Sequence, residues 1–477
     1  FSMNPKETSN KKGKWYDHMP HTFIILFGII VIATVMTWLV PAGEFNRAAD
    51  PESGRMIIEQ GTYHVVDKNP SGFFAMFVAI AKGLSASSSI IFMILLSSGA
   101  FKVINATGAL ENSIGVMLCK VKRSKIPGSA VIFIITFLFS CLGLVVGPEI
   151  QIPFTIIGVS IALGLGYDLI VGLAMIVVGG GIGFALGPVC ASTVGTADAI
   201  SGLPLFSGMV LRTVCWFCGT VVSALIIIYY AEKVRKNPEK SLVKGIATEG
   251  LGLSRKLEDY RIGIQDKKVL MVLAGLFLCL IIGPAKFGWY LDEMMSVFLI
   301  AAILTAVIAH FPSGKAIDIF TKGAGEMFAA AMMVGLGRAI QVILENGKVL
   351  DTVIYSLSQP LAHFGPYMAA ILMTLVHGLI NFLIPSGSGQ AAATMPIMFP
   401  LGQVIGLTDQ TSILAFQAGD GITNIIYPTL GALMAMCGIA RVPFGQWFKF
   451  AVRVVVGVYA VTWLFLLIAV KINWGPF

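Results

Sequence analysis

The sequence predicts an all-α polytopic membrane protein with two inverted repeats, about nine transmembrane helices, two re-entrant hairpins and two broken helices. Composition is the first observation behind this prediction. The chain of 477 residues is 56% hydrophobic and 12% charged, whereas soluble domains carry about 25% charged residues. The second is a series of apolar runs near the length of about 20 residues that a helix needs to cross a bilayer. The third is that the two halves of the chain resemble each other.

The apolar runs place the expected membrane spans in chain order. The nine predicted spans cover residues 22–42, 88–108, 168–198, 206–230, 268–287, 292–311, 326–346, 411–437 and 444–471. The shorter apolar segment 74–86 is expected to lie along the outer membrane interface as an amphipathic helix. Residues 231–268 are rich in Lys and Arg and are predicted to form a linker between the halves.

Two further apolar regions, 128–166 and 366–406, are broken at their middle by Gly, Pro and polar residues. Lys and Arg concentrate on the cytoplasmic side of membrane proteins, which places the N-terminal tail and residues 119–125 and 231–268 inside. This arrangement requires 128–166 to return to the side from which it starts, and the same holds for 366–406 on the opposite side. Both regions are therefore predicted to be re-entrant hairpins, with the N-terminus inside and the C-terminus outside.

The two halves share an order of span, hairpin, broken span and span. The first copy starts from outside and the second from inside, so the repeats are inverted, as is typical of secondary transporters. The positions that correspond are Gly147 and Gly387, Gly166 and Gly406, Gly179 and Gly419, Gly181 and Gly421, and Pro188 and Pro428. The predicted divisions are 1–87 (tail, first scaffold helix and interfacial helix), 88–230 (first repeat), 231–325 (linker and two scaffold helices) and 326–477 (second repeat).

The stretch IPSGSGQAA at 384–392 is small, polar and helix-breaking, although apolar runs flank it. Irregular backbone cannot face lipid, because each unpaired N–H or C=O group would cost several kcal/mol. The hairpin tips at 145–151 and 384–391 are therefore expected to meet inside the protein. The glycine-rich segments 179–181 and 419–421 are expected to interrupt the two broken helices there, followed by Pro188 and Pro428.

Polar side chains at the tips and breaks are the candidate site residues, because burial of charge in a membrane is costly and usually functional. The substrate-binding candidates are Glu149, Asn381, Ser386, Gly387, Ser388, Gln390, Asp420 and Asn424. Oxygen ligands suit hard cations, and the candidate Na⁺ ligands are Ser386, Ser388, Asp420, Glu149 and Gly181. Arg338 and His377 are weaker candidates, because an Arg can pair with a carbonyl at a helix end and a lone His on a helix is usually packed.

The chain resembles the YfcC family of bacterial membrane transporters, which is grouped with the DcuC-type dicarboxylate carriers and is distantly similar to the AbgT group. The resemblance rests on TWLVPAGEF, GTYHVVD, GLPLFSG and the long stretch IPSGSGQAAATMPIMFPLGQVIGLTDQTSILAFQAGDGITNIIYPT. It implies a bacterial inner-membrane protein in which hairpins and broken helices move against a dimeric scaffold, as in elevator-type carriers. The first repeat departs from the family pattern at 148–150 and 187–189, where Pro-Glu-Ile and Gly-Pro-Val replace the usual Gly-Glu-Glu and Asn-Pro-Phe.

These observations predict a secondary active transporter, an ion-coupled symporter or exchanger, for a small charged organic solute. A basic amino acid such as arginine or ornithine is the foremost solute, and a C4-dicarboxylate is the alternative. An ion channel with SGSGQ as its filter is the alternative from another class. The sequence contains no nucleotide-binding GxxxxGK[ST] motif, and no enzymatic activity is expected.

The expected partners are the solute, a coupling cation (Na⁺ or H⁺), the lipid bilayer and a second copy of the chain in a homodimer. Na⁺ is the single cofactor considered, as the coupling ion. The net charge of +8 is attributed to membrane orientation, and no nucleic acid is expected to bind.

Overall fold

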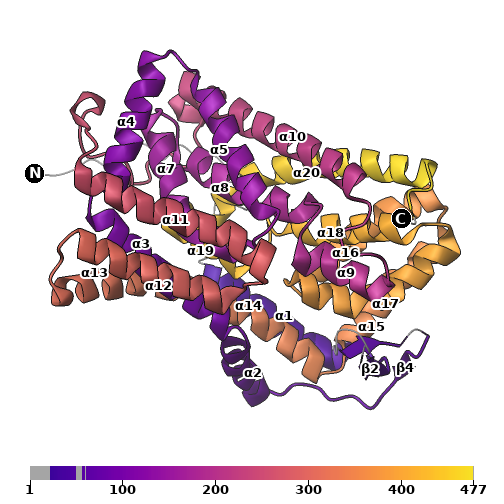
Figure 1. Cartoon of the computed structure of the whole chain (residues 1–477). Coiled ribbons are helices and arrows are strands. Elements are labelled where there is room, and N and C mark those ends of the chain that lie inside the picture. Colours follow the sequence, from indigo (N-terminus) through magenta and orange to yellow (C-terminus); the bar gives the residue numbers. More distant parts are fainter. Residues whose placement is uncertain (1–21, 50–55, 60, 476–477) are drawn as a thin grey trace, which may run out of the picture.

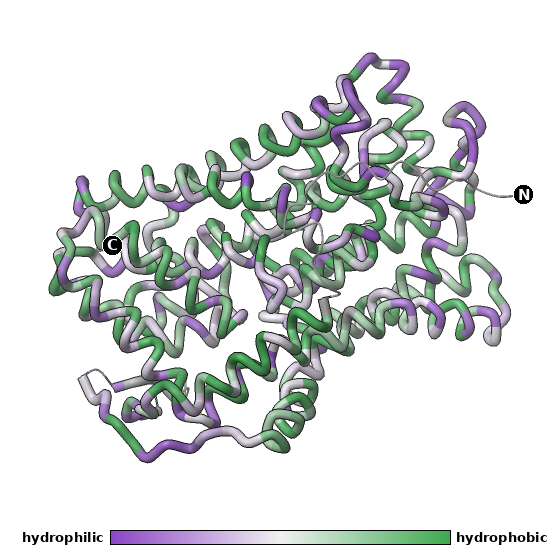
Figure 2. Tube along the Cα trace, turned by 180° about the vertical axis from the view of Figure 1, so that it is seen from behind, coloured by the Kyte–Doolittle hydropathy of each residue, from purple (hydrophilic) through white to green (hydrophobic). Residues whose placement is uncertain are grey.

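The computed structural model describes residues 22–49, 56–59 and 61–475. The basic N-terminal tail, on which the predicted orientation partly depends, lies outside these residues. Helices dominate the described part of the chain, and a small segment of short strands lies at one end (Figure 1). Figure 2 shows hydrophilic residues gathered mainly in loops at the ends of the molecule, with largely hydrophobic helices between them.

The helices of the first half run from α1 to α10. Their bounds are α1 Thr22–Leu39, α2 Phe73–Ala86, α3 Ser88–Ala106, α4 Ala109–Arg123, α5 Gly128–Gly143, α6 Pro148–Gln151, α7 Thr155–Gly164, α8 Leu169–Leu186, α9 Thr196–Ser201 and α10 Met209–Lys236. Two antiparallel strand pairs lie between α1 and α2. They join β1 (Gly43–Glu44) to β4 (His64–Val65), and β2 (Arg47–Ala49) to β3 (Met56–Ile58).

The helices of the second half run from α11 to α20. Their bounds are α11 Ile264–Phe287, α12 Leu291–Ile308, α13 Ser313–Glu326, α14 Phe328–Asn346, α15 Leu350–Ser358, α16 Pro366–Asn381, α17 Gly387–Ile405, α18 Asp409–Thr423, α19 Gly431–Ile439 and α20 Phe444–Lys471. The helix expected over 74–86 is present as α2. Each predicted hairpin region is a helix–turn–helix, formed by α5 with α6–α7 and by α16 with α17.

Several helices of the described residues are long and apolar enough to cross a membrane. There are six of them, or seven if the bent pair α13 and α14 counts as one span. Shorter apolar helices include α1, α5 and α16. The expected total of nine spans, which counts broken and shorter helices as well, stays a prediction.

Two helices, α8 and α18, form the centre of the molecule and contact each other. Every residue of α8 is buried, and so is every residue of α18 from Gln410 to Thr423. Around α8 lie α5, α7 and α10, and around α18 lie α16, α17 and α20. We name α5–α10 and α16–α20 the central group, and α1–α4 and α11–α15 the flanking group.

Small residues allow α8 and α18 to approach closely. A methyl group added to Gly421 would collide with Ala185, and one added to Gly181 would lie 3.1 Å from Ile425 Cγ1. The displacement of the predicted repeat takes Gly181 to Gly421 and Ala185 to Ile425. The contact of Gly421 with Ala185 therefore corresponds to the contact of Gly181 with Ile425. This is the arrangement expected if α8 and α18 are related by an approximate twofold axis.

The prediction that the glycine-rich segments 179–181 and 419–421 interrupt the two broken helices is wrong. The helix α8 continues through the triplet to Leu186, and the break covers 187–190, ahead of a π-helical turn at Ala191–Gly195. In the second half α18 likewise continues through 419–421 and ends at Thr423, and α19 begins at Gly431. The helices therefore stop at the segments that contain Pro188 and Pro428, because proline lacks the N–H that a helix needs.

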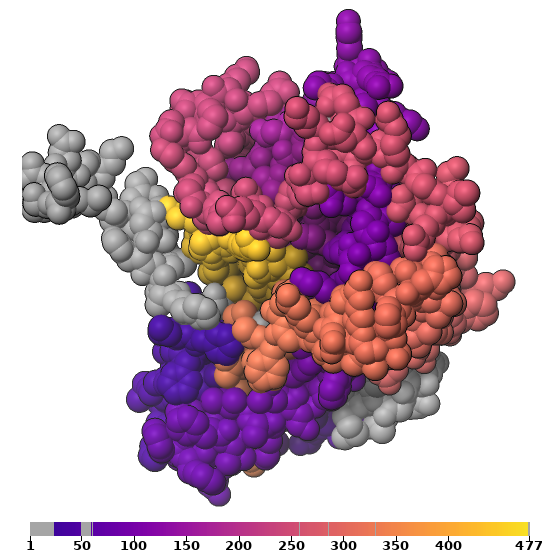
Figure 3. All heavy atoms as spheres, turned by 90° about the vertical axis from the view of Figure 1, so that its left-hand side faces the viewer, coloured from indigo at the N-terminus to yellow at the C-terminus, as the bar shows by residue number. Residues whose placement is uncertain are grey.

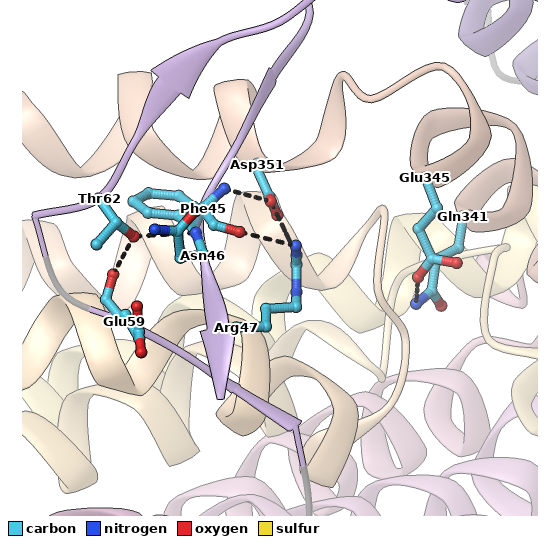
Figure 4. A network of polar contacts seen from close by, with 8 residues as sticks. All are labelled: Phe45, Asn46, Arg47, Glu59, Thr62, Gln341, Glu345 and Asp351. Carbon is cyan, nitrogen blue, oxygen red and sulfur yellow. Dashed lines mark hydrogen bonds and ion pairs between the residues drawn. The ribbon is translucent and has the colours of Figure 1, made fainter. Parts of the chain in front are cut away.

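The strand segment is fastened to α15 by a buried carboxylate (Figure 4). Arg47 Nη2 donates to Asp351 Oδ1 and Oδ2 at 2.7 and 2.8 Å, and the Phe45 N–H donates to Asp351 Oδ2 at 3.1 Å. The ring of Tyr63 stacks on Tyr355 at a centroid distance of 4.1 Å. These contacts close the chain between α1 and α2 over the end of α15.

We expect Asp351→Ala to lower the midpoint of thermal unfolding in detergent, because it leaves the buried Phe45 N–H without an acceptor. Such a group costs about 1–3 kcal/mol. The control is Lys244→Gln, which removes an ion pair to Glu239 whose side chains are 59% and 71% exposed and which is worth about 0–1 kcal/mol. Equal shifts for the two variants would contradict the assigned role of Asp351.

Candidate functional site

The tips of the two hairpins are helix N-termini. In the first hairpin α5 ends at Gly143 and α6 begins at Pro148, while in the second α16 ends at Asn381 and α17 begins at Gly387. The Ser386 hydroxyl oxygen accepts a hydrogen bond from the Gly389 N–H at 3.4 Å. Helix N-termini carry a partial positive charge. The free N–H groups at both tips therefore point into the space in front of each helix and can bind a negatively charged group there.

The tip of the second hairpin lies against the break of the first half. A methyl group added to Gly387 would lie 2.6 Å from Thr193 Cγ2, 3.3 Å from Phe184 Cζ and 3.4 Å from Asp420 Oδ2. The structure thus brings together two predicted site residues, Gly387 and Asp420. It adds Thr193 from the π-helical turn, which sequence reasoning missed because nothing local to Thr193 distinguishes it from a packing residue.

Asn381 holds the arm of the second hairpin against the broken end of α18. Its Nδ2 group lies 2.7 Å from the Asp420 carbonyl oxygen, 2.8 Å from Thr423 Oγ1 and 2.8 Å from Asn424 Oδ1, and donates to them. Because α18 stops at Thr423, its last carbonyls have no helical partner. The Asn381 side chain supplies a hydrogen-bond donor to one of these carbonyls, that of Asp420, and so helps to hold the chain at this break in position.

Several buried oxygens of α16, α17 and α18 have no hydrogen-bond partner in the described structure. They are both carboxylate oxygens of Asp420, Asn381 Oδ1, Gln390 Oε1 and Gln417 Oε1. An unsatisfied buried polar group costs about 1–3 kcal/mol, and carboxylate and amide oxygens are typical ligands of hard cations. The arrangement is therefore suited to a cation or to the positive group of a solute.

Gln417 and Gln390 each join two of these segments. Gln417 Nε2 donates to the Gly187 carbonyl at 2.7 Å, which lies in the break after α8. Gln390 Nε2 donates to the His377 carbonyl at 2.9 Å, so it ties the two arms of the second hairpin. Sequence reasoning predicted Gln390 but missed Gln417, because the partner of Gln417 comes from the other half of the chain.

Glu149 lies at the tip of the first hairpin and is half-buried. It is close enough to interact electrostatically with Asp420 and with the hydroxyl of Tyr290, which precedes α12 of the flanking group. Two carboxylates in range of each other repel unless a proton or a cation lies between them. The pair therefore also favours a positively charged ligand, and Tyr290 is a residue that sequence reasoning missed.

The remaining candidates take different positions. Asn424 accepts from Asn381 as described above, while the Ser388 side chain makes no hydrogen bond among the described residues. Gly181 lies inside α8 against Ile425, so the prediction that it stands at a helix break is wrong. Arg338 donates to the Gln341 side chain, and among the described residues it makes no bond to a carbonyl at a helix end. The described residues contain no cluster of three or more His, Cys, Asp or Glu that could hold a metal ion.

A cavity of about 680 Å³ separates the flanking and central groups at one end of the molecule. Ser98, Lys102 and Asn105 of α3 line one side, and Pro153 and Ile156, just after the first tip, line the other. Figure 3 looks onto this end of the molecule. The basic segments 119–125 and 231–268 lie at the same end, which the Lys and Arg distribution predicted to be cytoplasmic.

The cavity wall is charged. The Lys102 ammonium pairs with the Glu326 carboxylate at 2.8 Å, and Glu111 and Arg441 also line the cavity. Burial by itself would raise the pKa of Glu111, but hydrogen bonds from Ser254 and Tyr260 outweigh that effect and lower the pKa. Glu111 therefore remains ionised, and the cavity wall carries charges of both signs.

Residues 19–471 match the family model described as the C4-dicarboxylate anaerobic carrier, DcuC. The chain belongs to this family. It is 31% identical over 472 residues to YfcC of Escherichia coli strain K12, provisionally named a basic amino acid antiporter, and the match covers 90% of this chain and 92% of the relative. An uncharacterized protein of Haemophilus influenzae is 23% identical, over 94% of this chain and 96% of that protein. The resemblance to YfcC stated from the sequence is thereby confirmed.

Two solved structures show a remote likeness. The YdaH transporter of Alcanivorax borkumensis superposes with a TM-score of 0.42 at 16% identity, over 96% of this chain and 100% of that one. MtrF of Neisseria gonorrhoeae, from a class of antimetabolite efflux pumps, superposes with a TM-score of 0.44 at 14% identity, over 94% and 95% of the two chains. Family membership and the apolar helices together identify a multi-pass membrane protein of a transporter family.

Proposed function

We propose that the protein is a secondary active transporter that carries a small charged organic solute by elevator-type alternating access. A basic amino acid is the foremost solute. The main support for the proposal is that Gly387, Thr193 and Asp420 lie side by side in the interior of the protein. Thr193 comes from the first half of the chain, and the other two come from the second half. Secondary transporters bind their solutes between inverted repeats, at broken helices.

The proposed solute site lies between the two tips and the two breaks. Glu149 and Asp420 bind the positive group of the solute, and the helix N-termini at Pro148 and Gly387 bind its carboxylate. Asn381, Gln390 and Asn424 position these groups, and Ser386 and Ser388 line the second tip. An amino acid carries both signs of charge and would use both features, which is the reason for placing it first.

The proposed coupling ion is Na⁺, with Asp420 as its principal ligand and Ser386, Ser388 and Glu149 as further oxygen donors. The unpartnered oxygens of Asn381, Gln390 and Gln417 support this assignment. Proton coupling through Glu149 and Asp420 is the alternative. We place the protein in the bacterial inner membrane with a cytoplasmic N-terminus, and expect a homodimer formed through the flanking group.

A C4-dicarboxylate is the second candidate solute, favoured by the description of the family that the chain matches. The helix N-termini at the two tips would then receive its two carboxylates, and the acidic side chains would serve the coupling cation alone. A channel is the candidate from another class. The carriers among the relatives favour alternating access over a permanently open pore.

Uptake by purified protein in proteoliposomes tests these assignments. Labelled arginine, ornithine and succinate would each be offered with an imposed Na⁺ gradient, with a proton gradient, and with unlabelled solute inside. We expect accumulation of arginine driven by Na⁺ or by internal ornithine. Accumulation of succinate alone would favour the dicarboxylate, while rapid downhill ion current without accumulation of any solute would identify a channel.

We expect Ser388→Ala to raise the Na⁺ concentration for half-maximal uptake by roughly threefold to tenfold, because a lost neutral polar contact costs about 0.5–1.5 kcal/mol. Ser313→Ala, on α13 of the flanking group, is the control and should leave the Na⁺ dependence unchanged. An unaltered Na⁺ dependence in Ser388→Ala would reject this serine as an ion ligand.

A further inference from the structure

The apolar helix α14 carries a connected row of polar side chains. Arg338 Nη1 donates to Gln341 Oε1, and Gln341 Nε2 donates to Glu345 Oε1 at 2.6 Å. Figure 4 shows Gln341 and Glu345 facing each other. Residues spaced by three and four positions lie on one face of a helix, so we name Arg338, Gln341 and Glu345 the α14 polar row.

The α14 polar row belongs to the face of the helix that meets the central group. Gly431 packs directly on Val334, one turn before Arg338, and Gly337, which precedes Arg338, packs directly on the carbonyl of Thr429. Thr429 belongs to the break between α18 and α19, and Gly431 is the first residue of α19. Gln341 is 6% exposed, so the middle of the row is closed off from solvent, while Glu345 at its end is exposed.

The corresponding face of α3 is open. The displacement that matches Gly147 with Gly387 also matches Ser98 with Arg338 and Asn105 with Glu345, and both α3 residues line the 680 Å³ cavity. The surrounding helix crossings correspond as well. A methyl group on Gly323 of α13 would lie 3.1 Å from Gly99 Cα, and one on the matching Gly83 of α2 would lie 3.0 Å from Cα of Ala339, the counterpart of Gly99.

We infer that the α14 polar row is the wall of a second solute cavity, which opens at the end of the molecule near the strands when the central group moves along the flanking group. This inference rests on the proposed alternating-access function. The two halves have matching walls, and one is open while the other is closed, as expected if the two cavities open in turn. Movement of the central group would uncover Gln341 and close the cavity beside Asn105.

Arg338 binds the carboxylate of the solute in this second cavity. A guanidinium offers paired N–H donors whose geometry matches a carboxylate, and amino acids and dicarboxylates both carry that group. In the present conformation the Gln341 side-chain oxygen accepts a hydrogen bond from one N–H group of Arg338, and the Gln341 side-chain nitrogen donates to Glu345. Opening of the cavity would allow a solute carboxylate to replace the Gln341 oxygen as the acceptor for Arg338. Until then, the hydrogen bond to Gln341 keeps the guanidinium from being buried without a partner.

Cysteine labelling tests where the cavity opens. Gln341→Cys would be introduced into a variant without native cysteines and exposed to a membrane-impermeant cationic thiol reagent, in right-side-out and inside-out vesicles. Arginine exchange should raise the labelling rate of Gln341→Cys at least tenfold, from the side opposite to that labelling Asn105→Cys. Ala339→Cys, which faces α2 on the same helix, is the matched control and should stay unlabelled.

The outcomes separate this inference from the proposed function. If labelling of Asn105→Cys responds to solute while that of Gln341→Cys never does, alternating access holds and the second cavity lies elsewhere. If uptake occurs but solute changes the labelling rate of neither cysteine, the proposed alternating-access function is rejected, and this inference is rejected with it.

A kinetic measurement tests Arg338 without a cysteine. Arg338→Gln should raise the KM for solute offered at the strand end at least tenfold, and Arg338→Lys should raise it less, because lysine keeps the charge and loses the paired donors. An unchanged KM in Arg338→Gln overturns the assignment of Arg338.

Discussion

Replacement of Asp420 by Asn is expected to abolish solute accumulation in proteoliposomes while leaving expression and folding intact. The carboxylate is fully buried, and neither of its oxygens has a hydrogen-bond partner in the described structure. Removal of one partner from a buried charge pair costs about 2–5 kcal/mol. Since about 1.4 kcal/mol corresponds to a tenfold change, cation binding should weaken by roughly 30-fold or more.

The matched control is Asp409→Asn, the same substitution at the opposite end of α18. Asp409 accepts hydrogen bonds from Gln403 at 3.0 and 3.3 Å and lies away from both tips, so uptake should persist. Normal accumulation in Asp420→Asn would remove this residue from the site. Loss of gradient-driven accumulation with retained solute exchange would instead indicate that Asp420 carries the coupling proton, because asparagine resembles the protonated acid.

Gly387→Ala is expected to reduce uptake at least tenfold, because the new methyl group would lie 2.6 Å from Thr193 Cγ2. Overpacking of this kind costs about 1–3 kcal/mol, and here it would push the second tip away from the break in the first half. Gly389→Ala is the matched control, since its methyl group would meet atoms of its own tip, Ser386 Oγ at 3.1 Å, Ser386 Cβ at 3.3 Å and Ile384 Cγ2 at 3.7 Å.

A second substitution makes this prediction specific. Thr193→Ser removes the methyl group with which the new side chain of Gly387→Ala collides, and it keeps the hydroxyl. Gly387→Ala combined with Thr193→Ser should therefore recover a large part of the uptake. Thr193→Ser alone shows whether the hydroxyl or the methyl group matters to the solute. If the double variant is as impaired as Gly387→Ala, the defect does not come from contact between the tip and the break.

Most helix positions could be predicted from the sequence because their causes are local. The run of apolar residues in 366–381 and the polar tip after Asn381 are visible without any knowledge of neighbours, and α16 and α17 begin and end close to the expected residues. The candidates Gly387 and Asp420 were found in the same way. A carboxylate and a helix-breaking tip inside apolar sequence are each unusual enough to be noticed alone.

The exact place of the first break could not be predicted, because packing and not propensity decides it. Gly180 would ordinarily weaken a helix, yet here it makes room for Gln151 of the first tip, and Gly183 makes room for the Ser140 carbonyl of α5. These neighbours hold α8 together through the glycines. Thr193, Gln417 and Tyr290 were missed for a related reason, since each gains its role from a partner distant in the sequence.

The amino-acid sequence by itself determined that this chain lies in a membrane and that polar turns interrupt its apolar runs, because hydropathy and helix breaking act over a few neighbouring residues. Only the tertiary structure decided which tip meets which break, which buried oxygens are left without partners, and that α3 faces a cavity while the middle of the α14 polar row is closed. Those features depend on distances between residues far apart in the chain, and such distances are set when the helices pack.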